Sequence, residues 1–261
     1  MALDKAITNK ELRTTTKLSR QVRKYRNIIQ GHHLLKISQY LNLNLRHDIL
    51  ESSKNFNPDF DGTFDLGKAL QGRVSKVLEL ECFIKILFIL FLWREQKHEL
   101  CMELVKNLLE RIIGANRRTL DYYSALLYYH FTRLHEKNNS DSNIREYLLE
   151  SYNKACVRCD EIGQSTLLNL LLRNYLRDNQ IDAAYNLIEK TSFPETKSNN
   201  EFCRYLYYTG RVKAIRREYA DALNSLNQAI RKSPDSAKGF KIQCQKVAIV
   251  VELLLGGIPN R

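Results

Sequence analysis

The sequence has few of the residues that make turns. Its 261 residues include only four prolines and ten glycines, whereas 44% of the residues are apolar. β-Sandwiches and dinucleotide-binding α/β folds need more turn residues than this. The composition therefore argues against those folds and predicts a nearly all-α chain with enough apolar residues for a core. The chain is longer than a usual single domain of roughly 100–200 residues, which suits a helical array whose units pack only on their neighbours.

The sequence motifs of common active sites are also missing. No serine lies in a G-x-S-x-G turn, and neither a GxxxxGK[ST] nor a GxGxxG string occurs. The six histidines are scattered, and His130 lies in YYHFTRLH among core-like residues. We therefore expect no enzyme activity and no cofactor, and we expect His130 to be a core or boundary histidine.

Cys156 and Cys159 form a CVRC pair without the surroundings that such a pair needs for chemistry. A redox pair is expected in a βαβ context, and a structural zinc site needs four ligands at a recognised spacing. Neither occurs here, so we expect no metal site and two thiols one helical turn apart, at least one of them buried. The other four cysteines lie in apolar runs with helical spacing, where a thiol behaves as a small buried hydrophobe.

Two stretches bear on where the protein resides. The opening MALDKAITNK has charges where a secretion signal would be apolar, so we expect reduced thiols and a cytoplasmic and nuclear location. The run CFIKILFILFLW, residues 82–93, contains Lys85 and is shorter than the roughly 20 apolar residues of a membrane span. It predicts a helix that is buried on most sides, and we expect no membrane contact.

The net charge of +12 is unevenly distributed along the chain. Residues 1–48 hold ten Lys and Arg against three acidic residues, whereas residues 49–261 hold 31 against 26. We predict a basic helical arm over residues 1–50 and a loop or linker over 51–73. Such an arm is either a solvated helix or a site for nucleic acid or an acidic protein.

From residue 74 onward the apolar residues recur with helical spacing, and the breaks between the helical stretches are short. Short breaks between long helices predict antiparallel neighbours. The expected helices cover residues 74–96, 97–114, 118–137, 142–161, 163–178, 180–191, 199–217, 219–232 and 237–255.

The stretch 201–234 matches the tetratricopeptide (TPR) pattern. Small residues at Gly210 and Ala222 would let two helices of a hairpin approach closely, and bulky Tyr219 and Leu226 would fill the space beside them. The 34-residue period is not kept strictly along the chain. We therefore predict an all-α, right-handed superhelical array of antiparallel helix pairs, an irregular TPR-like solenoid, over residues 74–261. The matching positions are Leu206, Gly210, Tyr219, Ala222, Leu226, Ala229 and Pro234.

Three long strings carry a resemblance to a known family. They are DEIGQSTLLNLLLRNYLRDNQIDAAYNLIEKTSFPE at 160–195, NNEFCRYLYYTGRVKAIRREYADAL at 199–223 and GFKIQCQKVAIVVELLLGGIPNR at 239–261. The chain resembles the non-ATPase regulatory subunit 3 family of the 26S proteasome, which belongs to the regulatory-particle lid. The resemblance implies a non-catalytic scaffold for ubiquitin-dependent protein degradation, with helical repeats followed by a PCI module. Because the chain stops about where that module would begin, we expect a fragment, a truncated form or a short isoform.

The helix over 199–217 is the candidate for binding a partner. Arg204, Tyr208 and Arg211 share one face at i, i+4 and i+7. We predict a groove for an acidic, extended peptide, with packing between helices as the equal alternative. The resemblance implies other lid subunits as partners, including a small acidic disordered subunit of the DSS1/Sem1 type. The predicted surface comprises Arg204, Tyr207, Tyr208, Arg211, Arg216 and Arg217.

Two other functions stay open at this point. The basic charge would suit an RNA-binding helical-repeat protein, although we see no repeated base-reading position and regard nucleic acid as an unlikely partner. The repeat pattern would also suit a free-standing TPR adaptor that binds a short peptide tail.

Overall fold

The computed structural model describes residues 78–138, 144–194 and 198–258. The described residues form nine α-helices and one short 3-10 helix, which confirms the all-α prediction. They fall into two compact units that part between residues 138 and 139, and each unit is described by itself. The predicted arm of residues 1–50 and the linker of 51–73 lie outside the described residues.

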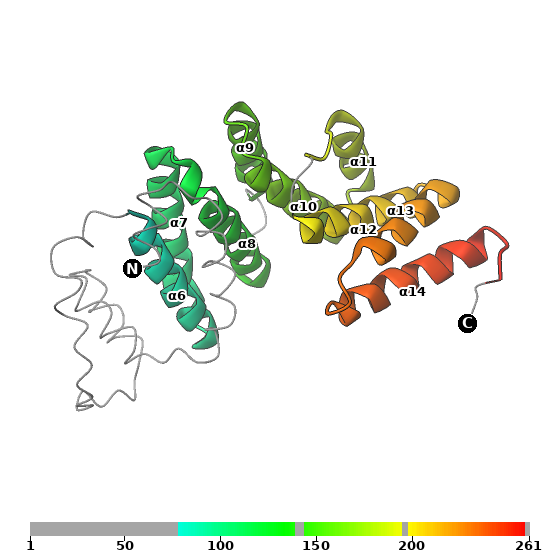
Figure 1. Ribbon diagram of the computed structural model, residues 1–261, viewed down its shortest axis with the longest axis horizontal. Helices are drawn as coiled ribbons and strands as arrows, with labels where there is room; N and C mark the ends of the chain where they lie inside the picture. Colours follow the sequence, from blue (N-terminus) through cyan, green and yellow to red (C-terminus); the bar gives the residue numbers. More distant parts are fainter. Residues whose placement is uncertain (1–77, 139–143, 195–197, 259–261) are drawn as a thin grey trace. The chain divides into compact units, whose positions relative to one another are not determined.

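The first unit contains α6 (Leu78–Arg94), α7 (His98–Ala115), η2 (Arg118–Leu120) and α8 (Asp121–Asn138) (Figure 1). Helix α7 packs against both α6 and α8. Cys82, Ile86, Ile89 and Leu92 of α6 are completely buried, so the long apolar run supplies the core of this unit, as predicted. Across the described ranges, no helix combines the length and apolar character that crossing a membrane requires.

A buried carboxylate ties the start of α6 to the turn before α8. Glu79 is only 2% exposed, and its Oε1 accepts a hydrogen bond from Thr119 Oγ1 at 2.8 Å. Arg117 Nη1 lies 3.4 Å from both carboxylate oxygens. Burying a charge is costly unless it is paired and hydrogen-bonded, and these contacts meet that need.

The second unit contains six helices (Figure 1). Helix α9 packs on α10, α10 on both α11 and α12, α12 on α13, and α13 on α14. Most helices therefore pack on the helix that follows them in sequence, as short connections require. The bounds are α9 Ile144–Val157, α10 Glu161–Arg177, α11 Ile181–Lys190, α12 Asn199–Ile215, α13 Tyr219–Lys232 and α14 Lys238–Leu254.

Polar contacts fix the turns on either side of α10. Asp160 precedes α10, and its Oδ1 accepts a hydrogen bond from the backbone nitrogen of Gly163 at 2.9 Å, which caps the helix. At the other end, Arg145 of α9 donates to Asn174 Oδ1 at 2.8 Å and to Gln180 Oε1 at 2.7 Å, and also pairs with Asp178. One arginine thus holds α9 against the turn between α10 and α11.

Helices α12 and α13 approach closely where the repeat pattern predicts it. A Cβ atom placed on Gly210 would lie 2.8 Å from Leu226 Cγ and 3.3 Å from the Ala222 carbonyl oxygen. Ala222, Leu226 and Ala229 are completely buried. The small residues therefore have the packing role that the TPR pattern assigns to them. The right-handed superhelical course of the array stays a prediction.

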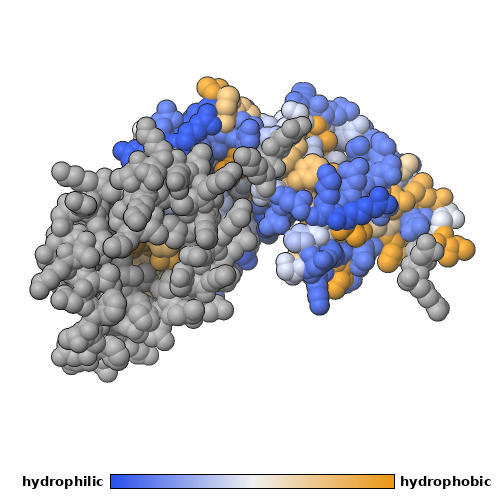
Figure 2. Space-filling model, viewed as in Figure 1, coloured by the Kyte–Doolittle hydropathy of each residue, from blue (hydrophilic) through white to orange (hydrophobic). Residues whose placement is uncertain are grey.

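Helix α14 packs one apolar face against the core and leaves a second apolar face exposed. Cys244, Ala248 and Val251 face the core, whereas further apolar side chains on the same helix are 43–57% exposed. Figure 2 shows hydrophobic residues gathered at the right, over the C-terminal half of α14 as Figure 1 places it. We call the exposed set the apolar face of α14; it consists of Ile242, Ile249, Val250, Leu253 and Leu254.

The prediction for the CVRC pair is wrong in one respect, because both thiols are exposed. Helix α9 ends at Val157, short of the predicted end at 161, so Cys159 lies in the turn and not on a helix face. The backbone of Cys159 has a φ of 52°, in the left-handed region, which ends the helix there. The other four cysteines are buried, as expected.

Candidate protein-binding surface

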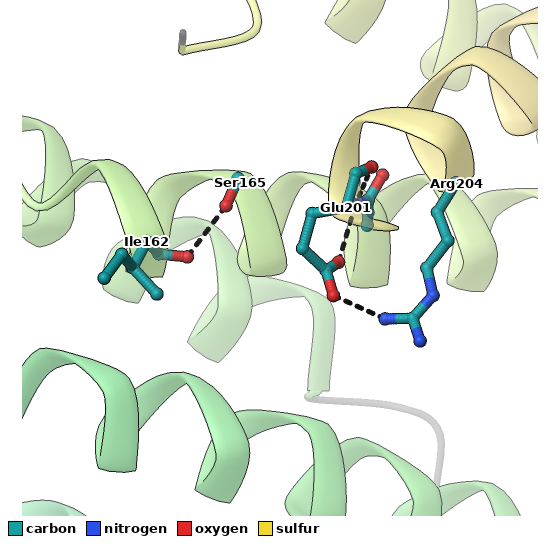
Figure 3. Close-up of polar contacts among 5 residues, drawn as sticks. Ile162, Ser165, Glu201 and Arg204 are labelled. Atoms are coloured by element: carbon teal, nitrogen blue, oxygen red, sulfur yellow. Dashed lines mark hydrogen bonds and ion pairs between the residues drawn. The ribbon is translucent and has the colours of Figure 1, made fainter. Parts of the chain in front are cut away.

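The six predicted residues all lie on α12 or at its C-terminal end, and we refer to them as the basic aromatic face of α12. Arg204 is paired with Glu201 one turn earlier, with Arg204 Nη1 and Glu201 Oε1 2.5 Å apart (Figure 3). Glu201 also accepts a hydrogen bond from Asn169 Nδ2 of α10 at 2.9 Å. The charge of Arg204 is therefore partly balanced by a carboxylate that is itself held in place.

Tyr207 and Arg211 lie on the side of α12 that faces α14. The Tyr207 ring meets Phe240 edge to face, with ring centroids 5.7 Å apart. The guanidinium carbon of Arg211 lies 5.7 Å from the centroid of the same tyrosine ring. Arg211 has no ion pair within the described ranges, so its guanidinium donors are available to a carboxylate.

Tyr208 faces the other way and joins the core between α10 and α11. It packs on the buried cluster that contains Leu172 and Ala184. Burial raises the pKa of Tyr208, and the positive charges of Arg173 and Arg204 oppose that rise. The ring centroids of Tyr207 and Tyr208 are nevertheless only 5.6 Å apart, so the two rings lie next to each other although they belong to different sides of α12.

Arg216 and Arg217 at the end of α12 have different surroundings. Arg216 lies 3.9 Å above the ring of Tyr185 and pairs with Asp182 at 3.1 Å, so it packs on α11. Arg217 is exposed and ends the helix with a φ of 69°. The structure therefore brings Tyr207, Tyr208 and Arg211 together and places Arg216 with α11.

Two aromatic residues that contact this surface are not among the six predicted ones. Phe240 lies 34 residues after Leu206, one TPR period further, so the repeat itself could have pointed to it. Tyr185 in α11 has no such signal. A hydrogen bond with Glu189, together with burial and Glu218, raises the pKa of Tyr185 to about 12.

The side chains of this surface have the chemistry that contacts between proteins use. Tyrosine rings give flat contact area, and arginine forks bind carboxylates. The apolar face of α14 adds a patch of a kind that often marks protein–protein contacts. Within the part of the chain that the structure describes, no three His, Cys, Asp or Glu side chains gather in a way that could hold a metal ion.

Comparison with known proteins shows which family the chain belongs to. A family model described as PSMD3-like, N-terminal TPR repeats, matches residues 2–261. The chain belongs to this family. The match confirms the resemblance that the strings at 160–195, 199–223 and 239–261 carry.

Individual relatives agree with the family match. The 26S proteasome non-ATPase regulatory subunit 3 homolog A of Arabidopsis thaliana is 44% identical over 195 residues, which cover 74% of this chain and 40% of the relative. The 26S proteasome non-ATPase regulatory subunit 3 of Dictyostelium discoideum is 33% identical over 273 residues, covering 99% of this chain and 54% of the relative. The chain thus spans between two fifths and about half of the length of these relatives.

Proposed function

We propose that the chain is a non-catalytic scaffold of the regulatory-particle lid of the 26S proteasome. In this role it supports ubiquitin-dependent protein degradation, in the cytoplasm and the nucleus, through contacts with other proteins. The proposal rests on the family match over residues 2–261. Relatives of the chain are named as proteasome regulatory subunits. The packing of helix pairs in the described residues agrees with it, because repeat arrays provide extended surfaces for binding.

The finer part of the proposal concerns partners. The chain contacts other lid subunits, and the basic aromatic face of α12 binds the small acidic disordered subunit. Arg211 and Arg217 supply positive charge without a carboxylate partner within the described ranges, and Tyr207 supplies the adjoining ring. Opposite charge across an interface favours the correct partner and speeds encounter.

Calorimetric titration with an acidic synthetic peptide tests this surface. Reversing the charge of Arg204 and Arg211 to Glu should weaken binding by more than tenfold, which corresponds to about 1.4 kcal/mol. Far-UV circular dichroism should show the same helix content, because both side chains are only half-buried.

A matched control separates this surface from the overall charge. Arg231 and Lys246 are exposed cations of the same unit, and reversing both to Glu changes the net charge equally. The control should keep most of the affinity. If both double variants lose the same affinity, or if the Arg204 and Arg211 variant loses none, the α12 surface is not the binding site. The scaffold role, which rests on the family match, would then depend on other surfaces.

A further inference from the structure

A second group of cations gathers in the first unit, around the only tryptophan of the chain. Trp93 lies near the end of α6. Arg133 Cζ and Lys137 Nζ, one turn apart on α8, lie 5.1 and 5.2 Å from the centroid of its ring. The ring of His98, the first residue of α7, tilts against Trp93 with centroids 5.3 Å apart. Together with Tyr129, these four residues form what we call the tryptophan cluster.

The two cations of the cluster have no acidic partner within the described ranges. The hydrogen bond of Arg133 goes to Tyr129 Oη at 3.4 Å, although a guanidinium carries five N–H donors. Lys137 Nζ donates to Gln96 Oε1 at 3.1 Å and lies 3.2 Å from His98 Nε2, and neither of these groups is a carboxylate.

Other arginines of the described chain contrast with this arrangement. Arg117 pairs with buried Glu79, and Arg145 pairs with Asp178. Glu95 is close to Trp93 in sequence, but it pairs with Arg94. The positive charge of the tryptophan cluster is therefore left without a carboxylate from the described chain, unlike the charges of Arg117 and Arg145.

Two further features make the same place attractive to an anion. Helix α7 begins at His98, and no side chain caps its first turn, so the positive end of its dipole adds to the potential there, although exposed Glu99 in the same turn offsets part of it. Burial and the neighbouring Lys137 lower the pKa of His98, so its ring is kept neutral beside the lysine. A carboxylate at this site would relieve the unfavourable proximity of two cations on one ring.

We propose that the tryptophan cluster is a docking surface for an extended, carboxylate-rich segment of a partner protein. Arg133 and Lys137 are spaced along one helical turn, with aromatic rings beside them. That spacing suits successive acidic side chains of an extended segment. Trp93 is only 9% exposed, so the half-buried ring of Tyr129 is the aromatic surface that such a segment would meet. The site lies in the other unit from the basic aromatic face of α12 and does not depend on it.

Trp93 allows a direct test, because all tryptophan fluorescence of the full chain comes from this site. Titration with a short oligoglutamate peptide should give a saturable change in fluorescence. Lys137→Glu should weaken the response by at least about tenfold, and Arg133→Gln should also weaken it. Lys106→Glu, a charge reversal at an exposed lysine of α7, should leave the response unchanged.

Other outcomes would overturn the proposal. Equal weakening by Lys137→Glu and Lys106→Glu would show that only the overall charge matters. A saturable response to inorganic phosphate as strong as that to oligoglutamate would indicate a small-anion site without a partner protein. A response to single-stranded RNA but not to oligoglutamate would assign the cluster to nucleic acid.

Discussion

Replacing Gly210 by Ala tests the close contact of α12 and α13 on which the repeat packing depends. The new Cβ would lie 2.8 Å from Leu226 Cγ, well inside the roughly 3.5–4.0 Å at which carbon atoms make favourable contact. Overpacking of this kind costs about 1–3 kcal/mol. Alanine also gains about 1 kcal/mol of helix propensity over glycine, so the net destabilisation should be about 0–2 kcal/mol.

The overpacking cost is best measured as a difference from a control. A Cβ on Gly239 of α14 would meet no atom within 4 Å, so Gly239→Ala should be neutral or stabilising by up to about 1 kcal/mol. Urea unfolding followed by circular dichroism should therefore separate the two variants by about 1–3 kcal/mol.

A double-mutant cycle then assigns the cost to the proposed contact. When Leu226 is already Ala, the added methyl group has room, and Gly210→Ala should no longer destabilise the chain. If Gly210→Ala and Gly239→Ala change the free energy of unfolding equally in the unmodified chain, α12 and α13 do not approach as closely as the structure shows.

Four further outcomes can be checked on the same protein. Leu226→Ala at a completely buried position should cost about 2–5 kcal/mol, whereas Leu253→Ala at a 57% exposed position should cost less than about 0.5 kcal/mol in urea unfolding. Asp160→Ala removes the cap of α10 and should cost about 1 kcal/mol, and Asp160→Asn should keep most of that stability. A thiol reagent at about pH 8 should modify Cys156 and Cys159 in the folded chain and the four buried cysteines only after unfolding. Because burial raises the pKa of those four thiols, they ionise first in the unfolded state, so stability should fall as pH rises above about 9.

The helices could be predicted from the sequence because their spacing and their stop signals agree. Predicted and observed bounds of the helix over 219–232 coincide, and those over 97–114 and 237–255 differ by one residue at each end. The contact at Gly210 was also predictable, since the TPR pattern specifies which small residues face each other. These features depend on residues that are close in sequence.

Contacts between helices distant in sequence were not predictable in the same way. The stacking of Arg216 on Tyr185 depends on how α11 and α12 lie against each other, and no local pattern specifies that. The tryptophan cluster likewise joins residues of α6, α7 and α8. Helix α14 is apolar on opposite faces, and only the position of its neighbours shows which face is exposed.

Affinity purification of the tagged chain from cells, with quantitative mass spectrometry of the bound proteins and extraction of bound nucleic acid, tests the central claim most directly. Our account predicts that subunits of the proteasome lid are the main bound species and that ribonuclease treatment leaves them bound. Recovery of RNA, or of a single chaperone, without lid subunits would contradict the account and favour an RNA-binding protein or a free-standing TPR adaptor.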